Sequence, residues 1–326
     1  MTMKAYVLSV DGGRAVLETR DVPVPVPGPG QLLVKMHAAG LNRGEFIPGG
    51  LIKAGVSKPA GLEGSGEVAA LGPGVAGPAV GARVMGRCPG AFAEYALMDA
   101  REALPVPAGL SMQEAAAVPL TFLVVHDMLV LQGRLRAGDW LLVTGVSSGV
   151  GVAALQAGKA LGARVVGTSG SAEKLARLRG LGLDVAIETR APDFADAVRA
   201  ATGEGGVQLA VNTVGGSLFA ECVRTLGFEG RLATVGYVDD TLAAEIDIQA
   251  LHVRRLTLFG VSNKMRSADQ RAAGVPAFVA DLLPAIADGR IRPLIDRVFP
   301  FDALPAAQAH MESNRHLGKI VLGIGD

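Results

Sequence analysis

The 326-residue chain is long enough for about two domains, and 49% of its residues are hydrophobic, so it can bury a substantial core. Lys plus Arg and Asp plus Glu both number 31, so the formal net charge is zero and nothing favours nucleic acid or another polyanion as a partner. The two cysteines, Cys88 and Cys222, are too few for a disulfide framework and have no metal-ligand spacing.

The amino-terminal third is typical of a β-rich, partly barrel-like domain, because short strand-like runs alternate with turns rich in proline and glycine. The loop over residues 40–59 belongs to no obvious strand. The predicted strands cover residues 3–9, 15–20, 31–38, 61–70, 83–85 and 91–97.

Two stretches are candidates for a signal peptide or a membrane span, and neither has the required pattern. The first ten residues begin a strand and lack signal-peptide architecture. The apolar stretch over residues 115–131 is interrupted by Pro119, His126 and Asp127, so we expect a buried helix rather than a membrane span. We therefore expect a soluble, cytoplasmic protein.

The segment over residues 139–174 has the pattern of a strand, a tight turn, a helix and a second strand. Leu141–Val143 is a short apolar run typical of a strand buried on both faces. A helix that begins at a glycine-containing turn offers unpaired N–H groups and a positive dipole end to a pyrophosphate. The G-x-G-x-x-G fingerprint is not literally present, because alignment on Gly151 places Val146 and Ser148 at the first two glycine positions. We predict a dinucleotide-binding turn, with an ordinary turn that binds no ligand as the alternative.

The following residues continue an alternation of strands and helices, which predicts a parallel, doubly wound Rossmann sheet. The predicted strands are 164–168, 185–187, 208–212, 231–235 and 256–260, and the helices are 172–181, 193–201 and 217–226. A helix over 276–288 and a closing strand over 318–323 are expected to rejoin the first domain. We therefore predict a β-rich substrate domain from residues 1–118 and 262–326, and a dinucleotide-binding domain from 119–261.

Nearly the whole chain resembles the medium-chain dehydrogenase/reductase superfamily, in its zinc-free quinone oxidoreductase branch. The motifs that carry the resemblance are, in order, PGPGQLLVKMHAAGLNRGEF, KPAGLEGSGEVAALGPGV, GAFAEYALM, AAAVPL, LLVTGVSSGVGVAALQAGKALGA, NTVGG, GRLATVGY and LGKIVL. The resemblance implies a GroES-like first domain and a homodimer whose subunits pair through the strand at residues 256–260.

The residue types argue against a zinc site. Zinc-dependent members of the superfamily place a cysteine where this chain has Asn42 and a histidine where it has Leu62, and they carry a lobe of four clustered cysteines. Glu63 is present without these partners. Catalytic zinc requires three protein ligands and an open fourth position. We therefore predict no metal.

The second strand of the nucleotide domain indicates NADPH rather than NADH. An NAD-specific site carries an acid about 20 residues past the glycine turn, and this chain has Thr168, Ser169 and Gly170 there. The resemblance assigns Lys174 and Arg315 to the 2′-phosphate, although a tyrosine of many relatives is Thr189 here. The alternative for Lys174 is a solvated helix residue. The predicted cofactor contacts are Val146, Ser147, Ser148, Gly149, Val150, Gly151, Thr168, Ser169, Lys174, Val214, Val235, Gly236, Phe259, Gly260, Val261 and Arg315.

The catalytic residues carry the least specific signal, because hydride transfer is the chemistry of the cofactor. Asn42 is the candidate for positioning the nicotinamide or a substrate carbonyl, with Arg43 and Glu45 beside it. The alternative for Asn42 is a loop residue that bonds its own backbone.

The first functional hypothesis is an NADPH-dependent oxidoreductase that transfers hydride to a quinone or an α,β-unsaturated carbonyl, a small apolar conjugated acceptor. The second is an enoyl-thioester reductase, for which Arg254, Arg255, Lys264 and Arg266 are candidate contacts to a phosphorylated carrier. The third is a non-catalytic NADPH-binding protein with the same fold.

Overall fold

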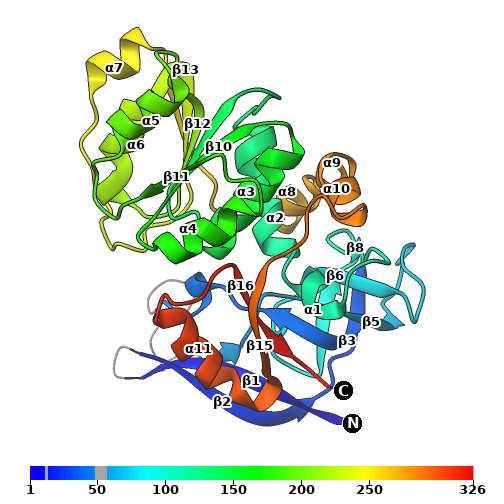
Figure 1. The fold of residues 1–326 in the computed structure, drawn as a ribbon. Helices are drawn as coiled ribbons and strands as arrows, with labels where there is room; N and C mark the ends of the chain where they lie inside the picture. The colour runs from blue at the N-terminus through cyan, green and yellow to red at the C-terminus, as the bar shows by residue number, and fades with distance from the viewer. Residues whose placement is uncertain (12–13, 48–56, 326) are drawn as a thin grey trace. The chain divides into compact units, whose positions relative to one another are not determined.

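The computed structural model describes residues 1–11, 14–47 and 57–325, which form two compact units (Figure 1). Unit 1 comprises Met1–Leu120 and Pro293–Asp326, and unit 2 comprises Thr121–Arg292. Part of the predicted loop over 40–59 lies outside the described residues. Among the helices that the structure describes, none is both long enough and apolar enough to cross a bilayer.

Unit 1 is the expected β-rich, GroES-like domain. A 7-stranded sheet has the order β15-β16-β3-β5-β6-β8, with β7 paired to β3, and a 3-stranded sheet has the order β2-β1-β4. The strands are β1 (Thr2–Asp11), β2 (Arg14–Pro23), β3 (Gln31–Gly40), β4 (Lys58–Pro59), β5 (Glu63–Leu71), β6 (Arg83–Arg87), β7 (Tyr95–Asp99), β8 (Leu104–Pro105), β15 (Ile295–Pro300) and β16 (Lys319–Gly323). The helices are η1 (Arg43–Glu45), α1 (Met112–Ala116), η4 (Phe301–Ala303) and α11 (Leu304–Glu312).

The core of unit 1 joins the two ends of the chain. Phe46 stacks on Phe92 with ring centroids 6.4 Å apart, and Tyr6 packs against Phe301 at 5.1 Å. Leu322 of β16 belongs to the same buried cluster. Because strand alternation places every second side chain inward, segments far apart in sequence share one apolar interior.

Unit 2 is the expected doubly wound Rossmann domain. Its 6-stranded parallel sheet has the order β11-β10-β9-β12-β13-β14. The strands are β9 (Trp140–Val143), β10 (Arg164–Ser169), β11 (Val185–Glu188), β12 (Val207–Asn212), β13 (Leu226–Thr234) and β14 (Thr257–Gly260). The helices are α2 (Pro119–His126, whose first two residues lie in unit 1), η2 (Asp127–Leu131), α3 (Gly149–Ala160), α4 (Ala172–Arg179), α5 (Ala195–Thr202), η3 (Gly216–Leu218), α6 (Phe219–Thr225), α7 (Ile248–Val253), α8 (Ala268–Ala272), α9 (Val275–Asp281) and α10 (Leu283–Ala287).

Small residues let α3 lie against the sheet. Residues 151–158 of this helix are all buried, and five of these eight residues are alanine or glycine. A Cβ added to Gly158 would lie 2.8 Å from Cδ2 of Leu141 on β9. The low aromatic content of the chain, 4%, is consistent with this close helix–sheet packing.

The described residues correct several predicted boundaries. The apolar stretch 115–131 is not one helix, because Pro119 lacks an N–H and begins a new helix, α2, which continues into the π-helical turn η2. The predicted helix over 276–288 is divided into α9 and α10 at Leu282. Strand β15 and helix α11 were not predicted.

The division between units also differs from the predicted one at its second boundary. Residues 262–292 lie in unit 2. The buried His126 of α2 bonds Asp281 of α9 at 2.8 Å and meets Phe278 edge-on. The N–H of Arg292 donates to Oε1 of Gln156 on α3 at 2.8 Å. These contacts attach the segment to the Rossmann domain, and the local sequence pattern does not reveal them.

Candidate functional site

The turn between β9 and α3 is held in shape by its own backbone. Gly145 has φ 59°, a left-handed conformation that favours glycine. The N–H of Val146 donates to the carbonyl of Thr168 at the end of β10, at 3.0 Å. Ser148 is the N-cap of α3, and its Oγ accepts from the N–H of Gly151 at 3.0 Å. The Ser148 hydroxyl hydrogen is therefore not used in this bond and can be donated to a ligand.

Gly151 lies where the helix passes closest to the turn. A Cβ at this position would be 2.4 Å from the carbonyl oxygen of Gly145 and 2.7 Å from Cα of Val146. Both neighbours are backbone atoms, so they cannot rotate out of the way. Only glycine fits without a shift of the turn, as the dinucleotide-binding interpretation requires of its third glycine.

Most of the predicted cofactor residues of unit 2 gather at one edge of its sheet. Val146 follows β9, Val214 follows β12, Val235 and Gly236 follow β13, and Phe259–Val261 ends β14. Because the strands are parallel, their carboxyl ends meet at this edge, and the order β10-β9-β12 puts the topological switch point between β9 and β12. The structure thus brings together residues that the sequence placed on separate motifs.

Asn212, which was not predicted as a site residue, shapes this edge. Its Oδ1 accepts from the N–H groups of Val214 and Gly215 at 3.0 and 3.1 Å, and its Nδ2 donates to the carbonyl of Gly215 at 2.7 Å. The N–H of Val235 donates to the carbonyl of Asn212 at 3.0 Å. The NTVGG motif contained the signal, because an asparagine before a glycine pair is a frequent turn former.

The end of β10 carries no acid. Thr168 and Ser169 are buried, and Oγ of Ser169 lies 3.1 Å from Oγ of Ser147 in the turn between β9 and α3. Lys174 is half-buried in the first turn of α4, where its N–H donates to Oγ of the N-cap Ser171 at 3.3 Å. Arg315, the remaining predicted phosphate contact, is exposed and lies in unit 1.

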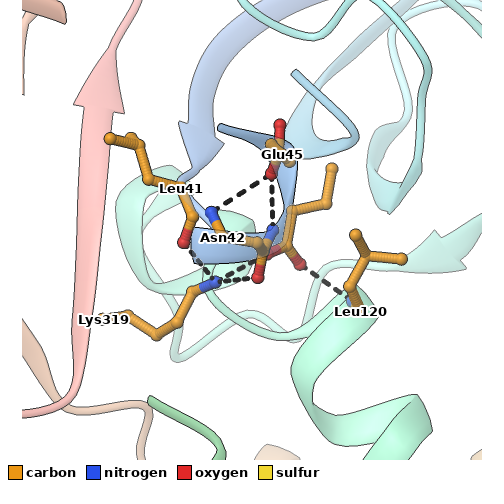
Figure 2. A network of polar contacts seen from close by, with 6 residues as sticks. Leu41, Asn42, Glu45, Leu120 and Lys319 are labelled. Carbon is orange, nitrogen blue, oxygen red and sulfur yellow. Dashed lines mark hydrogen bonds and ion pairs between the residues drawn. The ribbon is translucent and has the colours of Figure 1, made fainter. Parts of the chain in front are cut away.

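Unit 1 contains a buried polar network around Asn42 (Figure 2). Nζ of Lys319 donates to Oε1 of Glu63 at 2.7 Å, to Oδ1 of Asn42 at 2.8 Å and to the carbonyl of Leu41 at 3.0 Å. Nδ2 of Asn42 donates to Oε1 of Glu63 and to Oε1 of Glu45, both at 2.9 Å. All three ammonium hydrogens and both amide hydrogens therefore have partners.

Strand order positions the network. β16 and β5 flank β3 on opposite sides, and Lys319 and Glu63 are the first residues of these two strands. The chain leaves β3 at Gly40 and reaches Asn42 between them. A Cβ on Gly40 would lie 2.7 Å from Oε1 of Glu63, so glycine makes room for the carboxylate. The second oxygen of Glu63 accepts from the N–H of Leu120 at 2.8 Å.

The predicted catalytic residues Asn42, Arg43 and Glu45 are thus adjacent, but their polar groups are largely used within unit 1. Nη2 of Arg43 donates to the carbonyl of Met311 at 2.8 Å and to Oδ1 of Asn314 at 2.6 Å. Asn42 bonds side chains from two other strands. Lys319 was not predicted, and the only signal for it was a basic residue at the start of an otherwise apolar strand.

Glu45 is the member of the network with an unmatched atom. Its side chain is buried, and Oε2 has no hydrogen-bond partner. Burial raises the pKa of Glu45 to about 8, reinforced by the charge of Glu63 and opposed by the bonds from Asn42 and the charge of Lys319. Glu45 is therefore mostly protonated at neutral pH, and the charges of Glu63 and Lys319 balance each other.

The other reactive side chains give no alternative centre in the part of the chain that the structure describes. Burial raises the pKa of the Cys88 and Cys222 thiols well above the ordinary range, which disfavours a thiolate nucleophile. No group of three or more His, Cys, Asp or Glu among the described residues is placed to hold a metal ion.

Gly151→Val is expected to abolish NADPH binding, because its side chain would collide with the backbone of Gly145 and Val146. Calorimetric titration with NADPH would measure this, and circular dichroism would check that the variant is folded. The control is Ser147→Ala, which removes one neutral hydrogen bond and is expected to weaken binding by no more than about 1 kcal/mol. If the folded Gly151→Val variant binds NADPH as the parent does, this turn is not the cofactor turn.

Glu45→Gln is expected to change the pH dependence of stability. The carboxyl releases its proton near pH 4.5 in the unfolded chain but only near pH 8 in the folded protein. Its contribution to the free energy of unfolding therefore falls as pH rises from about 4.5 to 8. A glutamine, which resembles the protonated acid, lacks this loss. Urea unfolding should show the variant gaining stability relative to the parent between pH 5 and pH 8, whereas an equal difference at both pH values would contradict the shift.

Comparisons with known proteins agree with this architecture. Residues 28–108 match the family described as alcohol dehydrogenase GroES-like domain, and residues 149–275 match the family described as zinc-binding dehydrogenase. A spectinabilin polyketide synthase system protein of Streptomyces orinoci is 34% identical over 299 residues, which are 90% of this chain and 13% of that protein. The chain therefore spans only a small part of that relative. Quinone oxidoreductase of Rattus norvegicus is 29% identical over 331 residues, 98% of this chain and 97% of the relative.

Solved structures are similar over both units. A mycobacterial protein in complex with NADPH has a TM-score of 0.86 and 30% identity, covering 98% of this chain and 99% of the other. An NAD-dependent alcohol dehydrogenase has a TM-score of 0.84 and 31% identity, covering 99% of this chain and 100% of the other. A GroES-like unit, a Rossmann unit with its glycine turn, and two solved structures matched over 99% and 100% of their chains lead to one assignment. The chain belongs to the medium-chain dehydrogenase/reductase superfamily of oxidoreductases.

Proposed function

We propose that the protein is an NADPH-dependent reductase that transfers hydride to a quinone or an α,β-unsaturated carbonyl without zinc. The observation that carries this proposal is the turn before α3, where backbone atoms lie 2.4 Å from the site of a Cβ on Gly151. Such a close-packed glycine at a helix N-terminus, at the carboxyl edge of a parallel sheet, fits a pyrophosphate. The NADPH complex of a similar mycobacterial protein supports the same cofactor.

The residues present fit a phosphorylated dinucleotide. The segment from Val146 to Gly151 would hold the pyrophosphate, and Thr168, Ser169 and Lys174 would contact the adenosine ribose and its 2′-phosphate. The contribution of Arg315, which lies in unit 1, stays a prediction from the resemblance. The turns at Val214, Val235–Gly236 and Phe259–Val261 flank the nicotinamide. When bound, the nicotinamide supplies the hydride, and the protein supplies orientation and an electrostatic environment.

The residues around Glu63 do not fit a catalytic zinc ion. An amide, Asn42, and an aliphatic side chain, Leu62, occupy the positions where zinc-dependent relatives have a thiolate and an imidazole. The ammonium of Lys319 bonds both Glu63 and Asn42, so a positive charge already occupies the position beside the Glu63 carboxylate. We propose that Asn42, with Arg43 and Glu45 beside it, holds residues 41–45 in place through its hydrogen bonds to Glu45, Glu63 and Lys319.

An enoyl-thioester reductase is the second candidate, supported by the polyketide synthase relatives. Two of the four basic residues that would contact a phosphorylated carrier already have partners within the protein. Arg254 donates to the carbonyl of Leu226 at 2.8 Å, and Arg255 lies 3.5 Å from Glu229. Because these contacts engage two of the four candidates, we favour a small acceptor without a carrier. A non-catalytic NADPH-binding role is the third candidate.

One experiment separates the three candidates. NADPH oxidation by the purified protein is measured against quinones, enals, enones and enoyl thioesters, each with and without a metal chelator. Turnover of quinones or enones that survives chelation supports the leading proposal. Turnover confined to enoyl thioesters supports the second candidate, and NADPH binding without turnover of any acceptor supports the third. Loss of activity on chelation, restored by zinc, would overturn the zinc-free proposal.

Lys174→Ala is expected to raise the KM for NADPH by roughly 10–100-fold and to leave the KM for NADH nearly unchanged, because a charge-assisted bond to a phosphate contributes about 1.5–3 kcal/mol. Steady-state kinetics with both cofactors would measure the two values. Equal losses with both cofactors would show that Lys174 does not read the phosphate.

A homodimer is expected in solution. β14 is the last strand of the unit 2 sheet, and its Leu258 and Phe259 are only half-buried. Pairing with the same strand of a second copy would cover the free edge symmetrically. Light scattering at micromolar concentration would test this, and a monomeric mass would exclude it.

A further inference from the structure

The carboxyl end of β11 places a guanidinium across the end of β10. A Cβ on Gly170 would lie 2.0 Å from Nε of Arg190, 2.4 Å from its Cγ and 2.6 Å from its Cδ. The stem of Arg190 therefore runs directly over the Gly170 backbone. Both residues are exposed.

The backbone of the turn after β11 sets this position. Ser169 and Glu188 are partners in the parallel register of β10 and β11, and the N–H of Thr189 continues the pairing to the carbonyl of Ser169 at 3.1 Å. Oγ1 of Thr189 then accepts from the N–H of Ala191 at 3.0 Å and donates to Asp193 at 2.7 Å. The threonine thus fixes the turn that carries Arg190.

The guanidinium has no competing protein partner. No hydrogen bond or ion pair joins Arg190 to another residue within 1–11, 14–47 and 57–325. Five N–H donors are consequently available at the strand end where enzymes of this architecture read the ribose 2′ position. A planar guanidinium binds a phosphate through two parallel bonds and also stacks on a flat ring.

We infer that Arg190 is a specificity-determining residue for the adenosine 2′-phosphate, and that Gly170 is required because any side chain there displaces it. This inference rests on the proposed NADPH dependence and adds a second device to it. A larger residue at position 170 would displace the side chain of Arg190 from its place over the end of β10.

The matched variants are Arg190→Ala, Gly170→Ala and the double variant. Gly170 does not have a left-handed φ, and the atoms that a methyl group would meet belong to a flexible side chain, so the glycine variant should fold. Arg177→Ala, at an exposed position of α4, removes the same charge elsewhere on the surface and is the control. Circular dichroism checks each fold.

Binding of NADPH, NADH, 2′,5′-ADP and 5′-AMP is measured by calorimetry. Arg190→Ala is expected to weaken NADPH and 2′,5′-ADP roughly 10-fold or more, with NADH and 5′-AMP changed less than about 3-fold. Gly170→Ala should weaken the same two ligands in the parent but have no further effect in Arg190→Ala. Arg177→Ala should match the parent.

Several outcomes would overturn the inference. These are equal losses for phosphorylated and unphosphorylated ligands in Arg190→Ala, additive effects of the two substitutions, or an Arg177→Ala effect as large as that of Arg190→Ala. A parent that binds neither dinucleotide removes the proposed function as well. A parent that prefers NADPH while Arg190→Ala keeps that preference removes only the present inference.

Discussion

The buried ion pair between Glu63 and Lys319 is the interaction on which the arrangement of unit 1 depends. Both side chains are almost fully buried, so the desolvation of each charge destabilises the folded state unless the opposite charge lies beside it. The amide of Asn42 donates to Oε1 of Glu63 and accepts from Nζ of Lys319, and the N–H of Leu120 donates to Oε2 of Glu63. Removing one partner of such a pair typically costs about 3–5 kcal/mol, because an uncompensated charge is left behind.

The neighbouring Glu45 is kept protonated mainly by its burial, with a smaller contribution from the charge of Glu63. With Glu63 and Lys319 balanced, a second carboxylate would give the cluster a net negative charge in a site of low polarity. Glu45 avoids this by keeping its proton near neutral pH, at the expense of an unmatched oxygen. Residues 41–45, which follow β3, are therefore held by neutral and charged hydrogen bonds that depend on each other.

The two predicted binding regions differ in how readily the sequence reveals them. The strand, turn and helix at β9 and α3 were predictable because a buried strand, a glycine turn and an alanine-rich helix leave a local pattern, and the same holds for the α/β alternation. The contacts of Lys319 and the position of Arg190 over Gly170 were not predictable, since both depend on strands that pair only in the folded chain. Residues 262–292 were assigned to the wrong unit for the same reason, because their contacts with His126 and Gln156 form only in the folded chain.

At the carboxyl edge of the unit 2 sheet, one part of the surface is formed by backbone atoms and another by side chains. Around Gly151 the geometry is made by main-chain atoms, which leaves little freedom to vary. At the end of β10 the surface is made by side chains from different elements, Ser169, Lys174 and Arg190. In the proposed function, the pyrophosphate common to both dinucleotides would therefore meet a rigid backbone, while the group that distinguishes them would meet a few replaceable side chains.

The position of Lys319 has a consequence for synthesis of the chain. Glu63 is translated long before Lys319, and the residues of unit 2 are translated between them. A growing chain therefore cannot pair the carboxylate of Glu63 with Lys319, or add β16 beside β3, until residues 319–323 have left the ribosome. Unit 2 is continuous in sequence from Thr121 to Arg292 and needs no later segment for its sheet. Unit 2 can therefore complete its sheet earlier in translation than unit 1.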